Sequence, residues 1–263
     1  MILHDQHVHS LFSEDSEEDL KKYYLKAKKL GCQYFITTEH VDLDIAGMGV
    51  DWLADFNELK EVLNNIKESD GPIPLLGIEL GYRKDLKDKL LKIIKQHDFD
   101  LINLSIHDSG TMDYYFIEGF KEKGLKNTIR LYYEQMLEAV ENWNDFNVLS
   151  HINYGYKTIY NYDPSYDFFS DIEIIKKILI VLIQKNKALE INTKVADDLP
   201  IENTIGLLEL YKELGGSRIT ISSDAHELSR YLENFDKYVN IVKEIGFKYL
   251  CYFIKGEEKH FYL

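Results

Sequence analysis

The feature that most constrains the fold of this chain is a regular alternation of short strand-like runs with longer helix-like segments. The strand-like runs are centred on 2–8, 34–38, 73–79, 101–106, 147–151, 188–192 and 219–223, with a further short apolar run at 249–253. The segments between them carry apolar residues at spacings of three and four, as at Leu20, Tyr24 and Ala27. This alternation predicts a parallel α/β architecture.

Residues that favour helix ends agree with these boundaries. Ser16-Glu-Glu-Asp19 has the pattern of a capping box, and Gly31, Gly215 and Gly246 each follow a helix-like segment. The chain has no internal repeat, low-complexity stretch or linker rich in proline and glycine, and its 263 residues suit one barrel-sized domain. We therefore expect residues 1–263 to form a single domain.

Charge and local composition narrow the classes of partner. The chain has 45 Asp and Glu against 31 Lys and Arg, and its formal net charge of −14 repels polyanions, so we expect no nucleic-acid partner. No charged segment followed by an apolar run opens the chain, and no stretch approaches the roughly 20 apolar residues that span a bilayer. These observations predict no membrane association and a cytoplasmic location. Cys32 and Cys251 are expected to be small buried residues.

Histidines and carboxylates occur where the predicted strands end. The strand ends read Asp5-Gln6-His7-Val8-His9, Thr38-Glu39-His40, Gly77-Ile78-Glu79, Ser105-Ile106-His107, Ser150-His151 and Ser223-Asp224-Ala225-His226. Six of the nine histidines of the chain are in this set.

The spacing within these motifs indicates metal binding. Alternate residues of a strand point to the same face, so His7 and His9 can present two imidazoles to one ion, and Asp224 and His226 have the same spacing. Imidazole and carboxylate ligands suit Zn²⁺, Mn²⁺ or Fe²⁺. Periodicity alone allows an open doubly wound sheet or a closed barrel, but a barrel gathers residues from nearly every strand end on its C-terminal face. The spread of the motifs therefore favours a barrel with a metal site on that face.

In this ordered set the chain resembles the polymerase and histidinol phosphatase (PHP) superfamily, and within it the histidinol-phosphate phosphatases. The matching motifs extend from residue 5 to residue 226. The resemblance implies a distorted (β/α)7 barrel with three divalent metal ions (zinc, manganese or iron) at the C-terminal ends of the strands. It also implies an activity, the hydrolysis of L-histidinol phosphate to L-histidinol and phosphate in histidine biosynthesis, by attack of a metal-bridging hydroxide.

The resemblance further implies how nine residues would share the three ions. The first ion would be bound by His7, His9, Glu79 and Asp224, the second by Glu79, His107 and His151, and the third by Asp15, His40 and His226. From the sequence alone, Asp15 has an equal interpretation as a helix-capping acid beside Ser16.

Metal chemistry of this kind requires no serine or cysteine nucleophile, because two ions lower the pKa of a water between them. Asp224 and His226 are the predicted catalytic residues, with Asp224 orienting or deprotonating the attacking water. Asp5 and Glu39 either accept imidazole N–H groups of the ligands or are ordinary polar positions beside the site.

The predicted phosphate-binding residues depart from the family pattern. Histidinol-phosphate phosphatases of this type carry arginines where this chain has Lys157 and Lys194. Lysine still neutralises a phosphate but lacks the two-pronged grip of guanidinium. Arg83 is a third candidate for substrate binding. Tyr114-Tyr115-Phe116 either lines the pocket or anchors its loop.

Two other functions stay open at this point. The chain could be a related phosphoesterase acting on another small phosphate ester or on a nucleic-acid end, although its net charge disfavours the latter. It could also be a non-catalytic, metal-binding regulatory protein, although the complete ligand set disfavours loss of activity.

Overall fold

Strands and helices alternate along the chain in the computed structural model, which describes residues 3–263. The main sheet has the order β2-β1-β3-β4-β5-β6-β7. Its strands are β1 (Tyr34–Asp42), β2 (Trp52–Leu53), β3 (Ile73–Gly81), β4 (Leu101–Ser105), β5 (Val148–Leu149), β6 (Ala188–Asn192) and β7 (Ile219–Ser222). Only the short β2 is antiparallel to its neighbour. The predicted parallel α/β architecture is confirmed.

The N-terminal segment closes this curled sheet between β1 and β7. Thr38 donates its N–H to the carbonyl of Val8, and His9 donates to the carbonyl of Ala225, both at 2.8 Å. The predicted strand over 2–8 is wrong for its described part, because Val8 forms a single bridge, to Ala225, and residues 3–7 form none. The buried Asp5 carboxylate accepts the N–H groups of His7 and Ser223, which turns the chain away from a regular ladder. The result is the predicted distorted (β/α)7 barrel.

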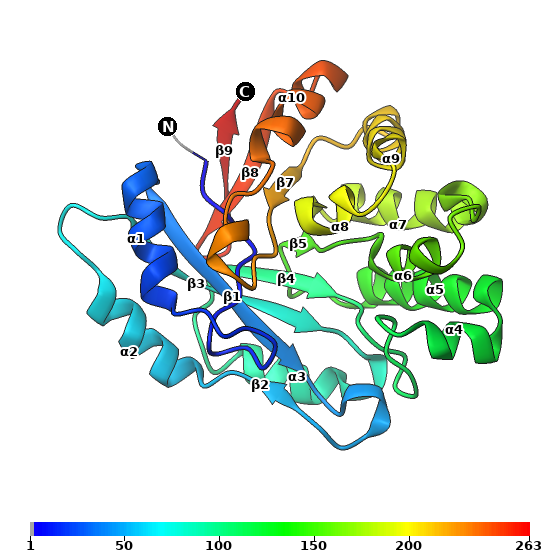
Figure 1. The fold of residues 1–263 in the computed structure, drawn as a ribbon, viewed down its shortest axis with the longest axis horizontal. Coiled ribbons are helices and arrows are strands. Elements are labelled where there is room, and N and C mark those ends of the chain that lie inside the picture. Colours follow the sequence, from blue (N-terminus) through cyan, green and yellow to red (C-terminus); the bar gives the residue numbers. More distant parts are fainter. Residues whose placement is uncertain (1–2) are drawn as a thin grey trace.

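The helices cover the outside of the barrel, and Figure 1 shows α4 to α9 on one side of the strands in this view and α1 and α2 on the other. The helices are α1 (Leu20–Leu30), α2 (Phe56–Ile66), α3 (Lys87–Ile94), α4 (Ile117–Lys123), α5 (Leu125–Asn142), α6 (Tyr154–Tyr162), α7 (Ile172–Gln184), α8 (Thr193–Asp197), α9 (Ile201–Glu213) and α10 (Phe235–Ile245). Gly31 and Gly246 end α1 and α10 with φ of 74° and 96°, as predicted. The N-cap of α1 is Asp19 rather than Ser16, since the Asp19 side chain accepts the Lys21 N–H.

A C-terminal hairpin closes the end of the barrel opposite the predicted metal site. Strand β8 (Tyr249–Ile254) pairs with β9 (Glu257–Tyr262), and the run predicted at 249–253 is thereby confirmed. Cys251 and Phe253 of β8 pack against a ring of apolar side chains from the first half of successive strands, Ile36, Leu75, Leu101, Val148 and Ala188. The hairpin therefore excludes water from the N-terminal mouth, while the C-terminal mouth stays open for chemistry.

His4 lies outside the predicted metal site and should make the fold sensitive to acid. His4 is 4% exposed, its ring packs against Tyr34 and Tyr252, and burial lowers its pKa to about 4. In the unfolded chain the pKa of His4 returns to about 6.5. Between about pH 6.5 and pH 4 the unfolded chain therefore binds a proton at His4 that the folded protein does not, so the free energy of unfolding falls as the pH falls. His4→Leu should reduce the loss of stability between pH 7.5 and pH 5 by about 2 kcal/mol. Urea denaturation at both pH values measures this, and an equal loss in both proteins would contradict it.

Candidate metal centre

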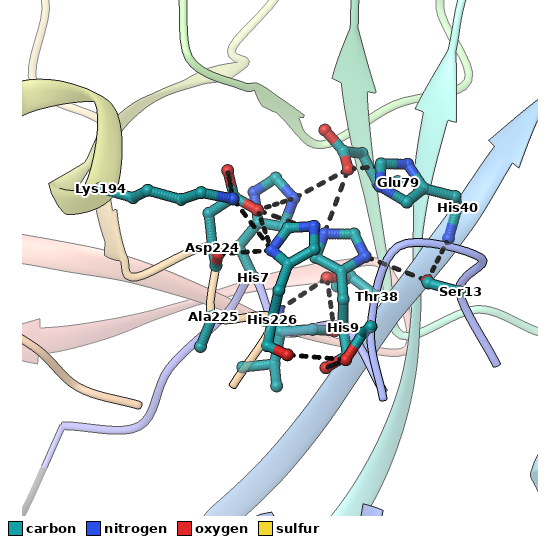
Figure 2. Close-up of polar contacts among 12 residues, drawn as sticks. His7, His9, Ser13, Thr38, His40, Glu79, Lys194, Asp224, Ala225 and His226 are labelled. Atoms are coloured by element: carbon teal, nitrogen blue, oxygen red, sulfur yellow. Dashed lines mark hydrogen bonds and ion pairs between the residues drawn. The ribbon is translucent and has the colours of Figure 1, made fainter. Parts of the chain in front are cut away.

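The structure brings all nine predicted ligand residues together at the C-terminal mouth of the barrel. Strand register contributes directly, because His40 of β1 and Glu79 of β3 are paired neighbours in the parallel ladder. The other ligand residues follow β4, β5 and β7 or belong to the N-terminal segment between β1 and β7. Figure 2 shows six of the nine, His7, His9, His40, Glu79, Asp224 and His226, converging on one small region.

The first predicted group is compact and buried. Glu79 Oε2 lies 3.1 Å from His7 Nε2 and 3.2 Å from His9 Nε2. Asp224 Oδ1 lies 3.3 Å from His9 Nε2 and 3.8 Å from His7 Nε2. All four side chains are less than a tenth exposed. The four atoms therefore surround one point.

The second group uses the other oxygen of the same carboxylate. Glu79 Oε1 lies 2.7 Å from His151 Nε2 and 3.1 Å from His107 Nε2. Ser105 donates its hydroxyl to this oxygen at 2.6 Å, which holds the carboxylate between the two groups. Glu79 thus has the placement of a bridging ligand.

The third group lies at the more open side of the cluster. Asp15 Oδ2 is 2.9 Å from His226 Nε2 and 3.5 Å from His40 Nε2. The His9 ring stacks between those of His40 and His226, with centroid distances of 4.2 and 4.3 Å. Asp15 is not the N-cap of α1, because Asp19 has that place. The placement of Asp15 therefore favours the ligand interpretation over the capping one.

The spacing of these atoms fits metal ions better than hydrogen bonds. The Nε2 atoms of His7 and His9 and both ring nitrogens of His40 are buried without a hydrogen-bond partner among the described residues, although carboxylate oxygens lie within 3.5 Å of each. Two ligand atoms bound to one zinc at about 2.1 Å lie about 3.4 Å apart in tetrahedral geometry. The lone pairs thus aim at shared points rather than at one another. The residues present fit divalent metal ions.

The pKa shifts within the cluster also favour the binding of metal ions. Burial would raise the pKa of Glu79, but His7, His107 and His40 around it hold that pKa well below its usual range. Burial would lower the pKa of His7, but the carboxylates of Glu79, Glu190 and Asp224 raise it well above the usual value. The carboxylates therefore give the centre a negative potential, which stabilises positive charge.

Two carboxylates that the sequence analysis did not select orient the imidazoles. Glu190 of β6 lies 2.7 Å from His7 Nδ1, and Asp42 at the end of β1 lies 2.7 Å from His107 Nδ1 and 3.0 Å from His40 Nδ1. At His7 and His107 these contacts are hydrogen bonds to Nδ1, which set the tautomer and leave Nε2 free to bind a metal.

Of the two interpretations of Asp5 and Glu39, direct contact with an imidazole N–H is not the one found in the structure. The Asp5 carboxylate accepts backbone N–H groups, including that of His7, and the Ser223 hydroxyl, and it makes no hydrogen bond with an imidazole within residues 3–263. Glu39 accepts the hydroxyl of Ser13 at 2.6 Å, and that hydroxyl lies 3.1 Å from His9 Nδ1, so Glu39 reaches the ring only through Ser13. Both acids position the N-terminal segment.

Two of the predicted ligand residues have a left-handed backbone. Asp224 has a φ of 51° and His151 a φ of 20°, conformations that cost free energy in residues other than glycine. Two hydrogen bonds stabilise the strained backbone at His151. The His151 N–H donates to Glu190 at 2.7 Å, and the Tyr132 hydroxyl donates to the His151 carbonyl at 3.2 Å. The surrounding structure therefore stabilises a backbone that directs these side chains into the centre.

A cavity of about 610 Å³ opens above the centre. Besides ligand residues, it is lined by Asp42, Ile45, Met48, Val50, Trp52, Asp108, Asp113, Tyr115, Phe116, Tyr154, Lys157, Lys194 and Val195. The three aromatic residues that were expected either to line the pocket or to anchor its loop divide between these two roles. Tyr114 is buried and bonded to Gln135, which anchors the loop, whereas Tyr115 and Phe116 line the cavity.

Of the three predicted substrate-binding cations, two face this cavity. Lys194 Nζ lies 3.0 Å from His226 Nδ1 and 3.8 Å from Asp224 Oδ2, and Lys157 Nζ pairs with Asp198 at 3.1 Å. Arg83 does not line the cavity and is only 7% exposed. Its guanidinium pairs with Asp44, Asp85 and Asp108, which leaves it no free donor face for a phosphate. The geometry contradicts the predicted role of Arg83.

Comparison with known proteins assigns this chain to a family. The family described as PHP domain matches residues 5–194. The chain belongs to the PHP domain family. Among similar proteins, a histidinol-phosphatase of Lactococcus lactis subsp. lactis (strain IL1403) is 32% identical over 253 residues, which span 95% of this chain and 93% of that protein. A probable histidinol-phosphatase of Clostridium acetobutylicum is 26% identical over 250 residues, 94% of this chain and 95% of that protein.

A solved structure extends the likeness to three dimensions. The crystal structure of histidinol phosphate phosphatase from Lactococcus lactis, complexed with zinc, L-histidinol and phosphate, has a TM-score of 0.84 to this chain at 29% identity. The match covers 97% of this chain and 98% of that one. Within residues 3–263 of this PHP chain, no helix combines the length and apolar character needed to cross a bilayer.

Proposed function

We propose that this chain is a metal-dependent phosphomonoesterase that hydrolyses L-histidinol phosphate to L-histidinol and phosphate, a step of histidine biosynthesis. The observation that carries the proposal is the convergence of nine His, Asp and Glu side chains, six of them buried, beneath a cavity of about 610 Å³. The relationship to histidinol-phosphatases over nearly the whole chain supports the choice of substrate. We also propose that residues 1–263 act as one domain, since one apolar cluster extends from Val8 to Leu250.

The proposed centre holds three divalent metal ions, one in each of the groups described above. Their proposed ligands are His7, His9, Glu79 and Asp224; Glu79, His107 and His151; and Asp15, His40 and His226. Such ions supply Lewis acidity, which activates water and neutralises charge on phosphate oxygens. Zinc fits the imidazole-rich set, and manganese and iron accept the same ligands.

Asp224 is the proposed catalytic residue for the attacking water. Its Oδ2 accepts the Asn192 amide N–H at 3.1 Å and faces Lys194, so the carboxylate has a defined orientation towards the cavity. From there it can hold a water in line with the phosphorus and accept hydrogen bonds from it. His226, which lies beside Lys194 and Asp224, is the second proposed catalytic residue.

Lys157 and Lys194 are the proposed phosphate-binding cations. Both reach the cavity from the outer side of the centre, Lys157 from α6 and Lys194 from α8. Each can approach a phosphate oxygen as a point charge, which partly offsets the negative field of the carboxylates around it.

Replacing Lys194 with alanine should mainly raise the KM for the phosphate ester. Loss of one cation that binds ground-state phosphate should raise KM about 10- to 100-fold and change kcat less than about fivefold. Steady-state phosphate release measures both constants, with the exposed Lys237→Ala as the matched control. An unchanged KM would remove Lys194 from the substrate site.

A substrate panel tests the proposed function. The purified, metal-loaded protein is assayed for phosphate release from L-histidinol phosphate, other small phosphate esters and oligonucleotides with terminal phosphates. We expect the highest kcat/KM on L-histidinol phosphate. A better small ester would identify a different phosphatase, and a loaded protein that releases no phosphate from any compound would indicate a non-catalytic metal-binding protein.

A further inference from the structure

Arg83 joins two loops that both form part of the cavity wall. The first wall segment, residues 44–53, follows β1 and includes β2 (Figure 1). It lines the cavity with Ile45, Met48, Val50 and Trp52. The second wall segment, residues 108–116, follows β4 and lines it with Asp108, Asp113, Tyr115 and Phe116. Neither segment supplies a proposed metal ligand.

The guanidinium of Arg83 bonds to both segments at once. Its Nη1 donates to the Asp44 carbonyl at 2.6 Å, and its Nη2 lies 3.4 Å from Asp44 Oδ2. The same Nη1 lies 3.5 Å from Asp108 Oδ1, and that oxygen also accepts the Gly110 N–H at 2.5 Å. Asp85, outside both segments, completes the set with a two-pronged contact at 2.6 and 3.2 Å. Such a planar, many-pronged arrangement suits arginine and not lysine.

Glycines allow the two segments to touch directly at this point. A Cβ on Gly47 would lie 2.6 Å from the carbonyl oxygen of Gly110, and a Cβ on Gly110 would lie 3.2 Å from Arg83 Cζ. The wall segments and the guanidinium are therefore packed against one another at contact distance.

The first wall segment also holds an unfavourable backbone. Asp44 and Ala46 have φ of 47° and 50°, left-handed values that residues with a Cβ seldom adopt. Strain of this kind persists only where contacts outweigh it, and here the Arg83 bonds to Asp44 are among those contacts. Without these bonds, Asp44 and Ala46 would relax to a more favourable backbone conformation, and the segment would move away from the cavity.

We propose that Arg83 is a positioning residue that sets the specificity of the cavity for the alcohol part of its phosphate ester. The proposal rests on the proposed function, because it assigns the phosphate to the metal centre and the two lysines. The wall segments then face the remainder of the substrate. Arg83 touches no substrate and acts by keeping both segments in place.

The test compares Arg83→Lys with wild type. We expect the KM for L-histidinol phosphate to rise about tenfold while kcat changes less than about threefold, because the reacting groups stay in place. The inhibition constant of inorganic phosphate and the bound metal should not change. Amide hydrogen exchange in residues 44–53 and 108–116 should speed up by about tenfold or more.

Two further variants keep the test decisive. Gly110→Ala disturbs the same contact while retaining the arginine, so it should give the same split between KM and kcat even if Arg83→Lys folds poorly. Arg130→Lys makes the same chemical change in an exposed pair with Glu134 on α5 and should alter none of these readouts.

A phosphate inhibition constant that rises together with KM would overturn the proposal, since Arg83 would then bind phosphate itself. Unchanged exchange and unchanged KM would overturn it as well. If the wild-type protein did not hydrolyse L-histidinol phosphate, the proposed function would fail, while hydrogen exchange would still decide whether Arg83 holds the two segments.

Discussion

Glu79→Gln should lower kcat by about 1000-fold or more, since loss of the bridging charge removes metal-dependent activation of water. Glu79 is 1% exposed, and its two oxygens reach His7 and His9 on one side and His107 and His151 on the other. Glutamine keeps the size of the side chain but offers one neutral oxygen and an amide that repels cations. The buried imidazoles would also lose the anion that offsets their positive charge.

Phosphate release and elemental analysis of the same preparation check this expectation. Both turnover and bound metal should fall together, whereas the exposed Glu134→Gln on α5 should behave as wild type. Circular dichroism shows whether the variant is folded. A folded Glu79→Gln protein with wild-type metal content and turnover would show that the carboxylate does not bridge two sites.

Asp224→Asn should lower kcat by about 100- to 10,000-fold, because it removes a metal-facing charge and a group that orients the water. Unlike Glu79, Asp224 is a proposed ligand in the first group alone: its Oδ1 lies 3.3 Å from His9 Nε2 and 3.5 Å from His226 Nδ1, and its other oxygen faces Asn192 and Lys194. We therefore expect a smaller loss of bound metal than in Glu79→Gln, with a loss of turnover out of proportion to it. The exposed Asp236→Asn on α10 is the control. Turnover that falls only in proportion to metal would make Asp224 a ligand without a further role.

The cluster was predictable from the sequence because it depends on strand ends. In a parallel barrel all the C-terminal strand ends lie at one face. The strand-end positions of His40, Glu79, His107 and His151 were therefore sufficient to predict that these residues lie together. The same logic could have found Asp42, which follows His40 by two residues in β1 and shares its face. Glu190 also had a signal, as one acid within the buried run Ala188–Asn192.

Other features depend on contacts that sequence spacing does not encode. Arg83 follows Glu79 closely and carries the charge expected of a phosphate ligand, yet its partners Asp44 and Asp108 come from separate loops. Only the folded loops show that its charge is neutralised away from the cavity. The irregular N-terminal segment was missed for a similar reason, because the Asp5 carboxylate competes for the backbone N–H groups of His7 and Ser223. The pattern of residues 2–8 is that of a strand, and the tertiary contact overrides it.

The most direct test of the central claim is phosphate release from L-histidinol phosphate as a function of bound divalent metal per chain. The protein is stripped with a chelator and reloaded in steps with zinc or manganese, and each sample is measured for metal content and turnover. We predict no turnover in the stripped protein and maximal turnover at about three ions per chain, the number that the three ligand groups can hold. Full turnover without metal, or a fully loaded protein that leaves L-histidinol phosphate intact, would contradict the account.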